Sequence, residues 1–262
     1  MSGALHVESD GHGETLVMLH GWGANLRVFE KLSHALRDHY RIVRVDLPGH
    51  GQSARYDAGQ SPSLDQLSER LQALIPTPAL WLGWSLGGQI ALRIATRFAA
   101  SVTGLVIVCS SPRFVATTDW PHAMPPAVLT QFAASLRRAP RQTVSDFLEL
   151  VVRGSQAADA SLQELQRALL EHGEACPIAL ADGLRLLQSG DLRADLATLQ
   201  CPTLVLSGEY DRIASPAASR ALAAALPRAQ HHEFRRAAHA PFLSHQREFV
   251  AQLQSWREQV AA

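Results

Sequence analysis

The sequence predicts an α/β protein with a doubly wound, mostly parallel sheet and a helical segment inserted before the last strands. Two patterns predict this fold. Short runs rich in Val, Ile and Leu alternate with amphipathic helical patterns through the first part of the chain, as in sheets covered on both faces. The alternation stops over residues 113–190, where apolar residues recur only at helical spacing, and a strand pattern returns at Thr203.

The strand patterns of the first part are short and almost entirely apolar, and helical patterns fill the gaps between them. The expected strands are residues 3–8, 15–20, 41–46, 79–84 and 103–109. The expected helices are residues 26–39, 63–75 and 86–99. Ser63 opens the second of these helices, and Gln66 follows three residues later, which is the pattern of a capping box.

Four further helical patterns follow a break at Pro125 and Pro126. They cover residues 128–136, 144–152, 162–170 and 178–187. The sheet then resumes with strands at 203–207 and 231–235, which alternate with helices at about 216–225 and 246–259. We therefore expect an α/β core of residues 1–112 and 191–262, with a helical lid of residues 113–190 packed on it.

The composition excludes several classes of function. The 262 residues include 24 Lys and Arg against 24 Asp and Glu, a balance without the basic surface of nucleic-acid binders. We find no apolar run of about 18 residues and no signal-peptide pattern. The three cysteines, Cys109, Cys176 and Cys201, lack the spacing of a zinc site or a disulfide framework and read as buried small hydrophobes. We expect a cytoplasmic monomer without nucleic-acid or membrane partners.

The segment Gly-Trp-Ser-Leu-Gly at 83–87 lies between an expected strand and an expected helix. In that context the pattern G-x-S-x-G is typical of a nucleophilic serine on a sharp strand-to-helix turn, and it makes Ser85 the candidate nucleophile. Glycine is needed two residues before and after the serine because the chain approaches itself closely there. The alternative is a glycine-rich turn that binds phosphate at a helix N-terminus.

A serine nucleophile needs a general base and a group that orients the base. Asp211 follows the strand expected at 203–207, and His239 follows the last expected strand. Both would project from the carboxyl ends of strands, where open α/β sheets bind ligands. Glu209, two residues before Asp211, is the alternative acid.

The developing oxyanion also needs hydrogen-bond donors. The segment His-Gly-Trp-Gly at 20–23 follows the second strand, and its glycines let the backbone curl towards Ser85. We expect the N–H groups of Trp22 and Leu86 to form the oxyanion hole, with the Trp22 indole as a pocket wall. His20 is expected to hold this loop in place rather than to transfer protons.

With these residues in place, the chain resembles the α/β-hydrolase superfamily, and within it the pimeloyl-[acyl-carrier protein] methyl ester esterases of biotin synthesis. The resemblance rests on the segments LHGWG at 19–23, GWSLGG at 83–88 and AAHAPFLSH at 237–245. The order of serine, aspartate and histidine along the chain is that of the superfamily. The resemblance implies a serine carboxylesterase that needs no cofactor or metal and releases methanol from a pimeloyl methyl ester carried by acyl-carrier protein.

The resemblance also implies roles for individual residues. Ser85, Asp211 and His239 would form the catalytic triad. Substrate would contact Trp22, Ser85, Leu86, Phe147, Val151 and His239. Val151 is a departure, because the family has a polar Gln four residues after the lid Phe. The acidic carrier protein would dock on lid arginines, for which the candidates are Arg137, Arg138, Arg141 and Arg153.

Other functions stay open on the same fold, because a fold does not fix a substrate. The chain could be a general short-chain carboxylesterase, a lactonase or a C–C hydrolase. From a different class, it could be a ligand-binding protein that kept the fold and lost turnover. Serine at position 85 argues against dehalogenase or epoxide-hydrolase chemistry, which uses a carboxylate nucleophile in related folds.

Overall fold

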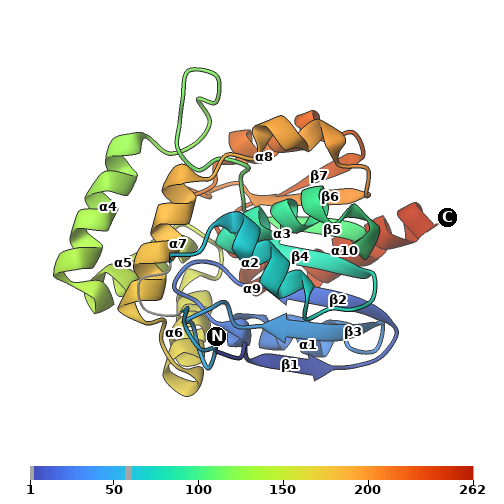
Figure 1. Ribbon diagram of the computed structural model, residues 1–262, viewed down its shortest axis with the longest axis horizontal. Helices are drawn as coiled ribbons and strands as arrows, with labels where there is room; N and C mark the ends of the chain where they lie inside the picture. The colour runs from blue at the N-terminus through green and yellow to red at the C-terminus, as the bar shows by residue number, and fades with distance from the viewer. Residues whose placement is uncertain (1–2, 57–60, 262) are drawn as a thin grey trace.

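In the computed structural model, which describes residues 3–56 and 61–261, seven strands form one sheet (Figure 1). The strands are β1 (Val7–Asp10), β2 (Glu14–Leu19), β3 (Tyr40–Val45), β4 (Ala79–Trp84), β5 (Val102–Val108), β6 (Thr203–Gly208) and β7 (Ala229–Phe234). They lie in the order β1-β3-β2-β4-β5-β6-β7, and every neighbouring pair is parallel except β1 with β3. The predicted doubly wound, mostly parallel sheet is confirmed.

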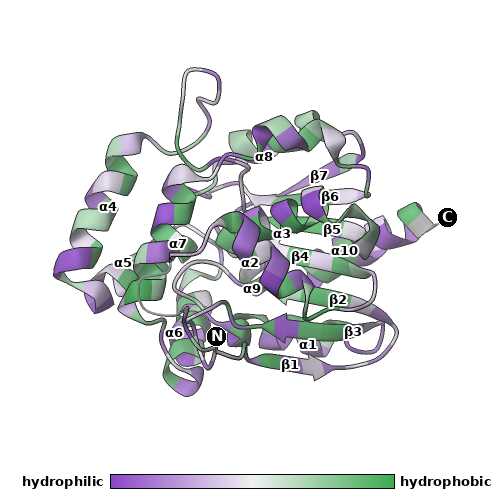
Figure 2. Cartoon of the chain, viewed as in Figure 1, coloured by the Kyte–Doolittle hydropathy of each residue, from purple (hydrophilic) through white to green (hydrophobic). Residues whose placement is uncertain are grey.

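Helices cover both faces of this sheet (Figure 1). The core helices are α1 (Glu30–Leu36), α2 (Leu64–Gln72), α3 (Leu86–Arg97), α8 (Pro216–Ala225), α9 (Pro241–Ser244) and α10 (Gln246–Ala261). Helix α1 packs with α10, and α2 packs with α3. Every residue of β4 is buried, and Figure 2 shows the central strands as predominantly hydrophobic, as expected for a sheet enclosed by two helical layers.

Four α-helices lie between β5 and β6, and we call them the helical insertion. They are α4 (Pro126–Arg138), α5 (Pro140–Val152), α6 (Ala158–His172) and α7 (Pro177–Ser189). Three of them begin with proline, which fits the first turn because its missing N–H would have no helical partner there. The insertion gathers at the end of the sheet where the parallel strands end (Figure 1). None of the described helices is long and apolar enough to span a membrane.

Local sequence signals place most core helices and strands well, and the two main exceptions, a helix and a strand, lie near the N-terminus. The Ser63–Gln66 capping box forms with both of its hydrogen bonds, at 2.9 and 3.2 Å. The helix expected at 26–39 instead begins as a 3₁₀ turn, because the Asn25 side chain accepts the Arg27 N–H and the Asp46 carboxylate accepts the Leu26 N–H. The first strand lies at Val7–Asp10 rather than at 3–8, where it pairs antiparallel with β3 as an edge strand.

Candidate active site

Ser85 lies on a strained turn between β4 and α3. Its φ of 56° and ψ of −119° are costly for a residue with a Cβ, by roughly 1–3 kcal/mol. The turn is possible because a Cβ on Gly83 would collide with the Gly87 carbonyl, and one on Gly87 would collide with the Leu19 carbonyl. The two glycines of the predicted motif are therefore required by close backbone approach, as the sequence indicated.

The backbone of Ser85 is held from the neighbouring strand. Its N–H donates to the Val108 carbonyl at 3.0 Å, and the Ser110 hydroxyl donates to its carbonyl at 2.6 Å. These bonds fix the turn while leaving the Ser85 hydroxyl without a hydrogen bond among the described residues. The serine is 2% exposed, so its hydroxyl faces a nearly closed site.

Asp211 and His239 form a fully buried pair. His239 Nδ1 lies 2.8 Å from Asp211 Oδ2, and since a carboxylate only accepts, Nδ1 carries the proton. The other oxygen of Asp211 accepts the N–H groups of Ile213 and Ala214, at 2.8 and 3.0 Å. The pair thus has one fixed tautomer, which leaves Nε2 of His239 as a lone-pair acceptor.

The loop that carries His239 is tied to both the sheet and the insertion. The indole N–H of Trp84, next to Ser85, donates to the His239 carbonyl at 2.8 Å. The His239 N–H donates to the carbonyl of Val151 in α5, at 2.9 Å. His239 Nε2 is buried without a hydrogen-bond partner in the described structure. The acid–base pair is therefore assembled, and the serine–histidine hydrogen bond is not formed in this conformation.

Glu209, the alternative acid, points elsewhere. Its side chain is exposed and accepts the backbone N–H of Arg236 at 2.7 Å. Only Asp211 of the two carboxylates is bonded to the His239 ring. The geometry favours Asp211, as the sequence did.

The His-Gly-Trp-Gly loop curls against the serine. A Cβ on Gly21 would lie 3.1 Å from the Ser85 Cβ, so the two backbones are close. Within the described residues, neither the Trp22 N–H nor the Leu86 N–H donates a hydrogen bond. These two backbone N–H groups beside the candidate nucleophile are therefore available to donate hydrogen bonds to an oxyanion.

The His20 side chain holds the His-Gly-Trp-Gly loop in place through hydrogen bonds at both ring nitrogens. The Leu47 N–H donates to His20 Nε2 at 2.9 Å, so the proton is on Nδ1, which donates to the Gly21 carbonyl at 2.8 Å. Burial lowers the pKa of His20, which keeps the ring neutral. Both nitrogens are occupied by the backbone, in agreement with the holding role expected from the sequence.

His50 is a second buried histidine in this region, and it should make the stability of the fold sensitive to acid. Burial, with a smaller effect from His20, lowers the pKa of His50 to about 3. In the unfolded chain histidine has a pKa of about 6.5, so between these values only the unfolded state binds the proton. The His50 contribution to stability is thus complete above about pH 6.5 and is lost as the pH falls towards 3.

We expect the free energy of unfolding to fall by about 2 kcal/mol between pH 6.5 and 5 because of His50 alone, at about 1.4 kcal/mol per pH unit. Replacement His50→Phe keeps an aromatic ring without the titratable nitrogens and should remove this part of the slope. Urea unfolding of both proteins at several pH values measures the difference. Parallel pH curves for the two proteins would contradict the assignment.

Aromatic side chains close the site from the insertion. The Trp22 ring makes edge contacts with Phe132 of α4 and Phe147 of α5, with centroids 5.1 and 5.0 Å apart. Its indole N–H donates to the Leu180 carbonyl in α7 at 2.8 Å. Trp22 thus packs between the core and three helices of the insertion, and its role as a pocket wall stays a prediction. Phe132 was missed, since nothing in its local pattern separates it from an ordinary apolar helix residue.

Cys109 lies closer to the site than its sequence pattern suggested. It follows β5 with a φ of 46°, is fully buried, and has its sulfur within 4.8 Å of ligand atoms of Asp211 and His239. Burial and the nearby Asp211 carboxylate raise the pKa of the thiol well above its usual range. The expectation of a buried side chain holds for Cys109, whereas Cys176 and Cys201 are half-buried. The contact of Cys109 with the acid–base pair could not be predicted from the sequence.

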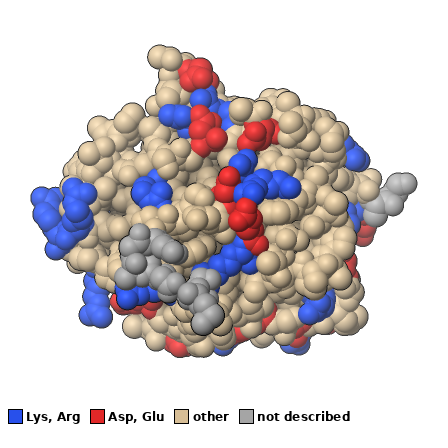
Figure 3. Space-filling model, viewed as in Figure 1, with Lys and Arg blue, Asp and Glu red and all other residues tan. Residues whose placement is uncertain are grey.

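The four candidate docking arginines are all exposed but do not form one patch. Arg137, Arg138 and Arg141 surround the corner between α4 and α5, where Figure 3 shows basic side chains at the left edge of the molecule. Arg141 pairs with Glu174 at 3.4 Å. Arg153 follows the other end of α5, about 18 Å away along the helix axis.

The fold and this site define the class of protein. The chain belongs to the alpha/beta hydrolase family, whose model matches residues 16–253. It is 43% identical over 250 residues to the pimeloyl-[acyl-carrier protein] methyl ester esterase of Stenotrophomonas maltophilia, covering 95% of each chain. The esterase of that name from Shewanella woodyi is 40% identical over 262 residues, with 98% of each chain covered. The resemblance inferred from the sequence is confirmed.

Solved structures agree on the fold. An esterase from Exiguobacterium antarcticum superposes with a TM-score of 0.88 at 23% identity, over 96% of this chain and 94% of the other. The enol-lactonase of Burkholderia xenovorans gives a TM-score of 0.83 at 22% identity, over 97% and 96%. At this level of identity the likeness concerns the architecture alone.

Proposed function

We propose that this protein is a serine carboxylesterase that hydrolyses the methyl ester of pimeloyl-[acyl-carrier protein], yielding pimeloyl-[acyl-carrier protein] and methanol in biotin synthesis. The observation that carries the proposal is the 40–43% identity, over nearly the whole chain, to relatives that bear this name. The geometry around Ser85 supports the chemistry. That the enzyme acts as a monomer in the cytoplasm remains a prediction.

In the proposed mechanism Ser85 Oγ attacks the ester carbonyl carbon while Nε2 of His239 takes its proton. Asp211 keeps the imidazole proton on Nδ1 and stabilises the imidazolium that forms. The tetrahedral intermediate then collapses, His239 protonates the methoxide as it leaves, and methanol departs. Water, deprotonated by His239, attacks the acyl-enzyme and releases the acid with Ser85 restored.

The N–H groups of Trp22 and Leu86 would hold the oxyanion of both tetrahedral intermediates. Removal of one such donor costs other hydrolases about 3 kcal/mol of transition-state stabilisation. Because the described structure gives these two N–H groups no other acceptor, they need no rearrangement when charge develops. His20 and Leu47 would keep the loop in place through their hydrogen bond.

We propose that the helical insertion, within residues 113–190, acts as a lid that binds the acyl chain. Phe147 packs edge-on against Trp22, and Val151 is fully buried beside the His239 loop. Since Val151 has no polar side-chain atoms, it would contribute apolar contact where the family has an amide. A cavity of about 430 Å³ extends from Gly23 between α5, α6 and α7, and its apolar lining would accept methylene groups.

The carrier protein would dock on the arginines of the insertion. We expect hydrolysis of the carrier-linked ester to fall as salt rises, because exposed charges act over a Debye length of about 8 Å at physiological ionic strength. The variant Arg137→Glu/Arg138→Glu should lose kcat/KM on this substrate. Hydrolysis of p-nitrophenyl butyrate, which carries no charge, should change little. Initial rates for both substrates at low and high salt give the comparison.

A matched control has the same change of charge elsewhere. Arg41 and Arg228 are exposed and lie at the amino ends of β3 and β7. The insertion lies at the opposite end of the sheet, where the parallel strands end (Figure 1). The variant Arg41→Glu/Arg228→Glu should keep activity on the carrier-linked ester. Equal losses on both substrates in the lid variant would mean that the arginines support the structure of the lid. Testing Arg153→Glu separately shows whether the far end of α5 takes part.

The physiological substrate is tested by complementation. The gene is expressed in a biotin-requiring bacterial strain that lacks its own esterase for this step, with Ser85→Ala as control. Growth without biotin that depends on Ser85 supports the proposal. Failure to grow, combined with ready hydrolysis of p-nitrophenyl butyrate, would assign the chain to the general carboxylesterases instead.

A further inference from the structure

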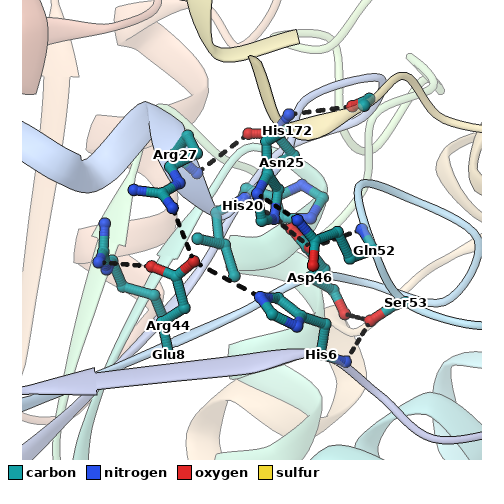
Figure 4. A network of polar contacts seen from close by, with 12 residues as sticks. His6, Glu8, His20, Asn25, Arg27, Arg44, Asp46, Gln52, Ser53 and His172 are labelled. Atoms are coloured by element: carbon teal, nitrogen blue, oxygen red, sulfur yellow. Dashed lines mark hydrogen bonds and ion pairs between the residues drawn. The ribbon is translucent and has the colours of Figure 1, made fainter. Parts of the chain in front are cut away.

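A second polar cluster lies outside the candidate active site, where the edge strand β1 meets the end of α6 (Figure 4). His6, Glu8 and His172 each offer a ligand atom, and these atoms all lie within 4.8 Å of one another. His6 Nε2 is 3.5 Å from Glu8 Oε1, and the two histidine rings are 5.2 Å apart. Two imidazoles and a carboxylate are ligands typical of zinc and similar divalent ions.

The geometry fixes the tautomer of His172 in favour of a metal ligand. Its Nε2 lies 2.8 Å from the fully buried carboxylate of Asp46, so Nε2 carries the proton. Nδ1 is then a lone pair, and it accepts the side-chain amide of Gln52 at 3.2 Å. A ligating histidine that donates its other N–H to a carboxylate is the usual outer-shell arrangement of metal sites. Gln52 is exposed, so its amide can turn to water when an ion takes its place.

Both oxygens of Glu8 are paired with arginines, and an ion would have to displace Arg27 from one of them. Arg44 binds Oε2 at 2.8 Å, whereas Arg27 binds Oε1 at 3.1 Å. Arg27 also pairs with Glu30 at 3.0 Å, so it keeps an ionic partner if a cation replaces it at Oε1. The side chains of His6 and Glu8 are 29% and 22% exposed, which gives an ion a path from solvent.

We propose that His6 Nε2, Glu8 Oε1 and His172 Nδ1 bind one divalent transition-metal ion, with zinc the best match to this set of two nitrogens and one oxygen. Water would complete the coordination. The ion would join β1 of the core to the end of α6, and so fasten one side of the helical insertion. It would take no part in ester hydrolysis. The proposal is independent of the proposed substrate.

The test uses the full chain without an affinity tag, treated with a chelator and then desalted. Zinc chloride is titrated by calorimetry, and the thermal midpoint is measured with and without zinc. We expect one equivalent to bind and the midpoint to rise, because an ion that binds only the folded state stabilises it. The variant His6→Ala should weaken binding by at least about tenfold and abolish the rise. Its fold should be kept, since the His6 backbone retains its bonds to Ser53 and Asp46.

Two further variants separate a site from a general effect. Arg27→Ala should strengthen zinc binding several-fold, because it removes the cation that competes for Glu8 Oε1. His232→Ala removes a surface histidine paired with Glu248 at 2.9 Å, and it should leave zinc binding unchanged. The opposite effects of the Arg27 and His6 variants would not arise from a loss of structure.

Three results would overturn the proposal. The first is absence of zinc binding by the wild-type protein at concentrations that saturate ordinary zinc sites. The second is binding that His6→Ala leaves unchanged. The third is binding that abolishes hydrolysis of p-nitrophenyl butyrate in both proteins, which would place the ion at the buried cluster of Cys109, Asp211 and His239.

Discussion

Replacing Ser85 or His239 with alanine is expected to lower kcat for ester hydrolysis by about a million-fold, the loss seen when a serine hydrolase of known mechanism is deprived of either group. Each side chain is useless without the other, because the serine is a poor nucleophile until the imidazole takes its proton. The double variant should therefore be little worse than either single variant. Rates on p-nitrophenyl butyrate, with single-turnover measurements for the slow variants, provide the numbers.

The fold should survive these changes, which the thermal midpoint and circular dichroism can check. Alanine at position 85 keeps the Cβ and the backbone bonds to Val108 and Ser110. Loss of His239 leaves Asp211 with its two backbone donors, Ile213 and Ala214. Losses that multiply in the double variant would show that the two residues do not share one mechanism.

The replacement Asp211→Asn is expected to lower kcat by about ten-thousand-fold. The Asp211 carboxylate accepts the proton of His239 Nδ1, whereas the amide of Asn can present its N–H there and favour the wrong tautomer. The backbone N–H groups of Ile213 and Ala214 can still bond to the Asn oxygen, so the loop should remain in place. Steady-state rates over a range of pH measure the loss.

Glu209→Gln is the matched control, since it removes a carboxylate two residues away with the same chemical change. Its side chain accepts a backbone N–H from Arg236 and does not reach the histidine. We expect this variant to keep nearly full activity. A severe loss in Glu209→Gln together with an active Asp211→Asn would mean that the acid has been assigned to the wrong residue.

Much of the fold and the centre of the site could be predicted from local sequence. The close approach of Gly83 to the Gly87 carbonyl acts within the five residues of the G-x-S-x-G turn, whereas Gly87 is required by its contact with the Leu19 carbonyl of the neighbouring strand. Local causes also explain the Ser63 capping box and the prolines that begin helices of the insertion. The positions of the inner strands β2 to β6 followed from apolar runs, because both faces of the sheet are buried there. The edge strands β1 and β7 are largely polar, and they lie at other residues than expected.

What could not be predicted depends on contacts between distant segments. Phe132 reaches Trp22 only because α4 folds back over the core, and Cys109 meets Asp211 only because β5 and β6 are neighbours. The pairing of His172 with Asp46 joins residues 126 positions apart. Hydrophobic periodicity carries no information about such tertiary contacts, because they depend on how distant segments pack together in the fold.

The hydrogen bond from the His239 N–H to the Val151 carbonyl has a consequence for how substrate gains access. Val151 belongs to the final turn of α5, so raising that end of the helix would pull on the loop that bears the general base. The end of α6 is also held to the core by Asn25, whose side-chain amide donates hydrogen bonds to the Ala168 and Gly173 carbonyls. We therefore expect an entrance to open where α4 turns into α5, away from both of these attachments, so that the general base keeps its position. The proposed docking residues Arg137, Arg138 and Arg141 lie at this corner, so a carrier protein bound there would present its acyl chain at the expected entrance.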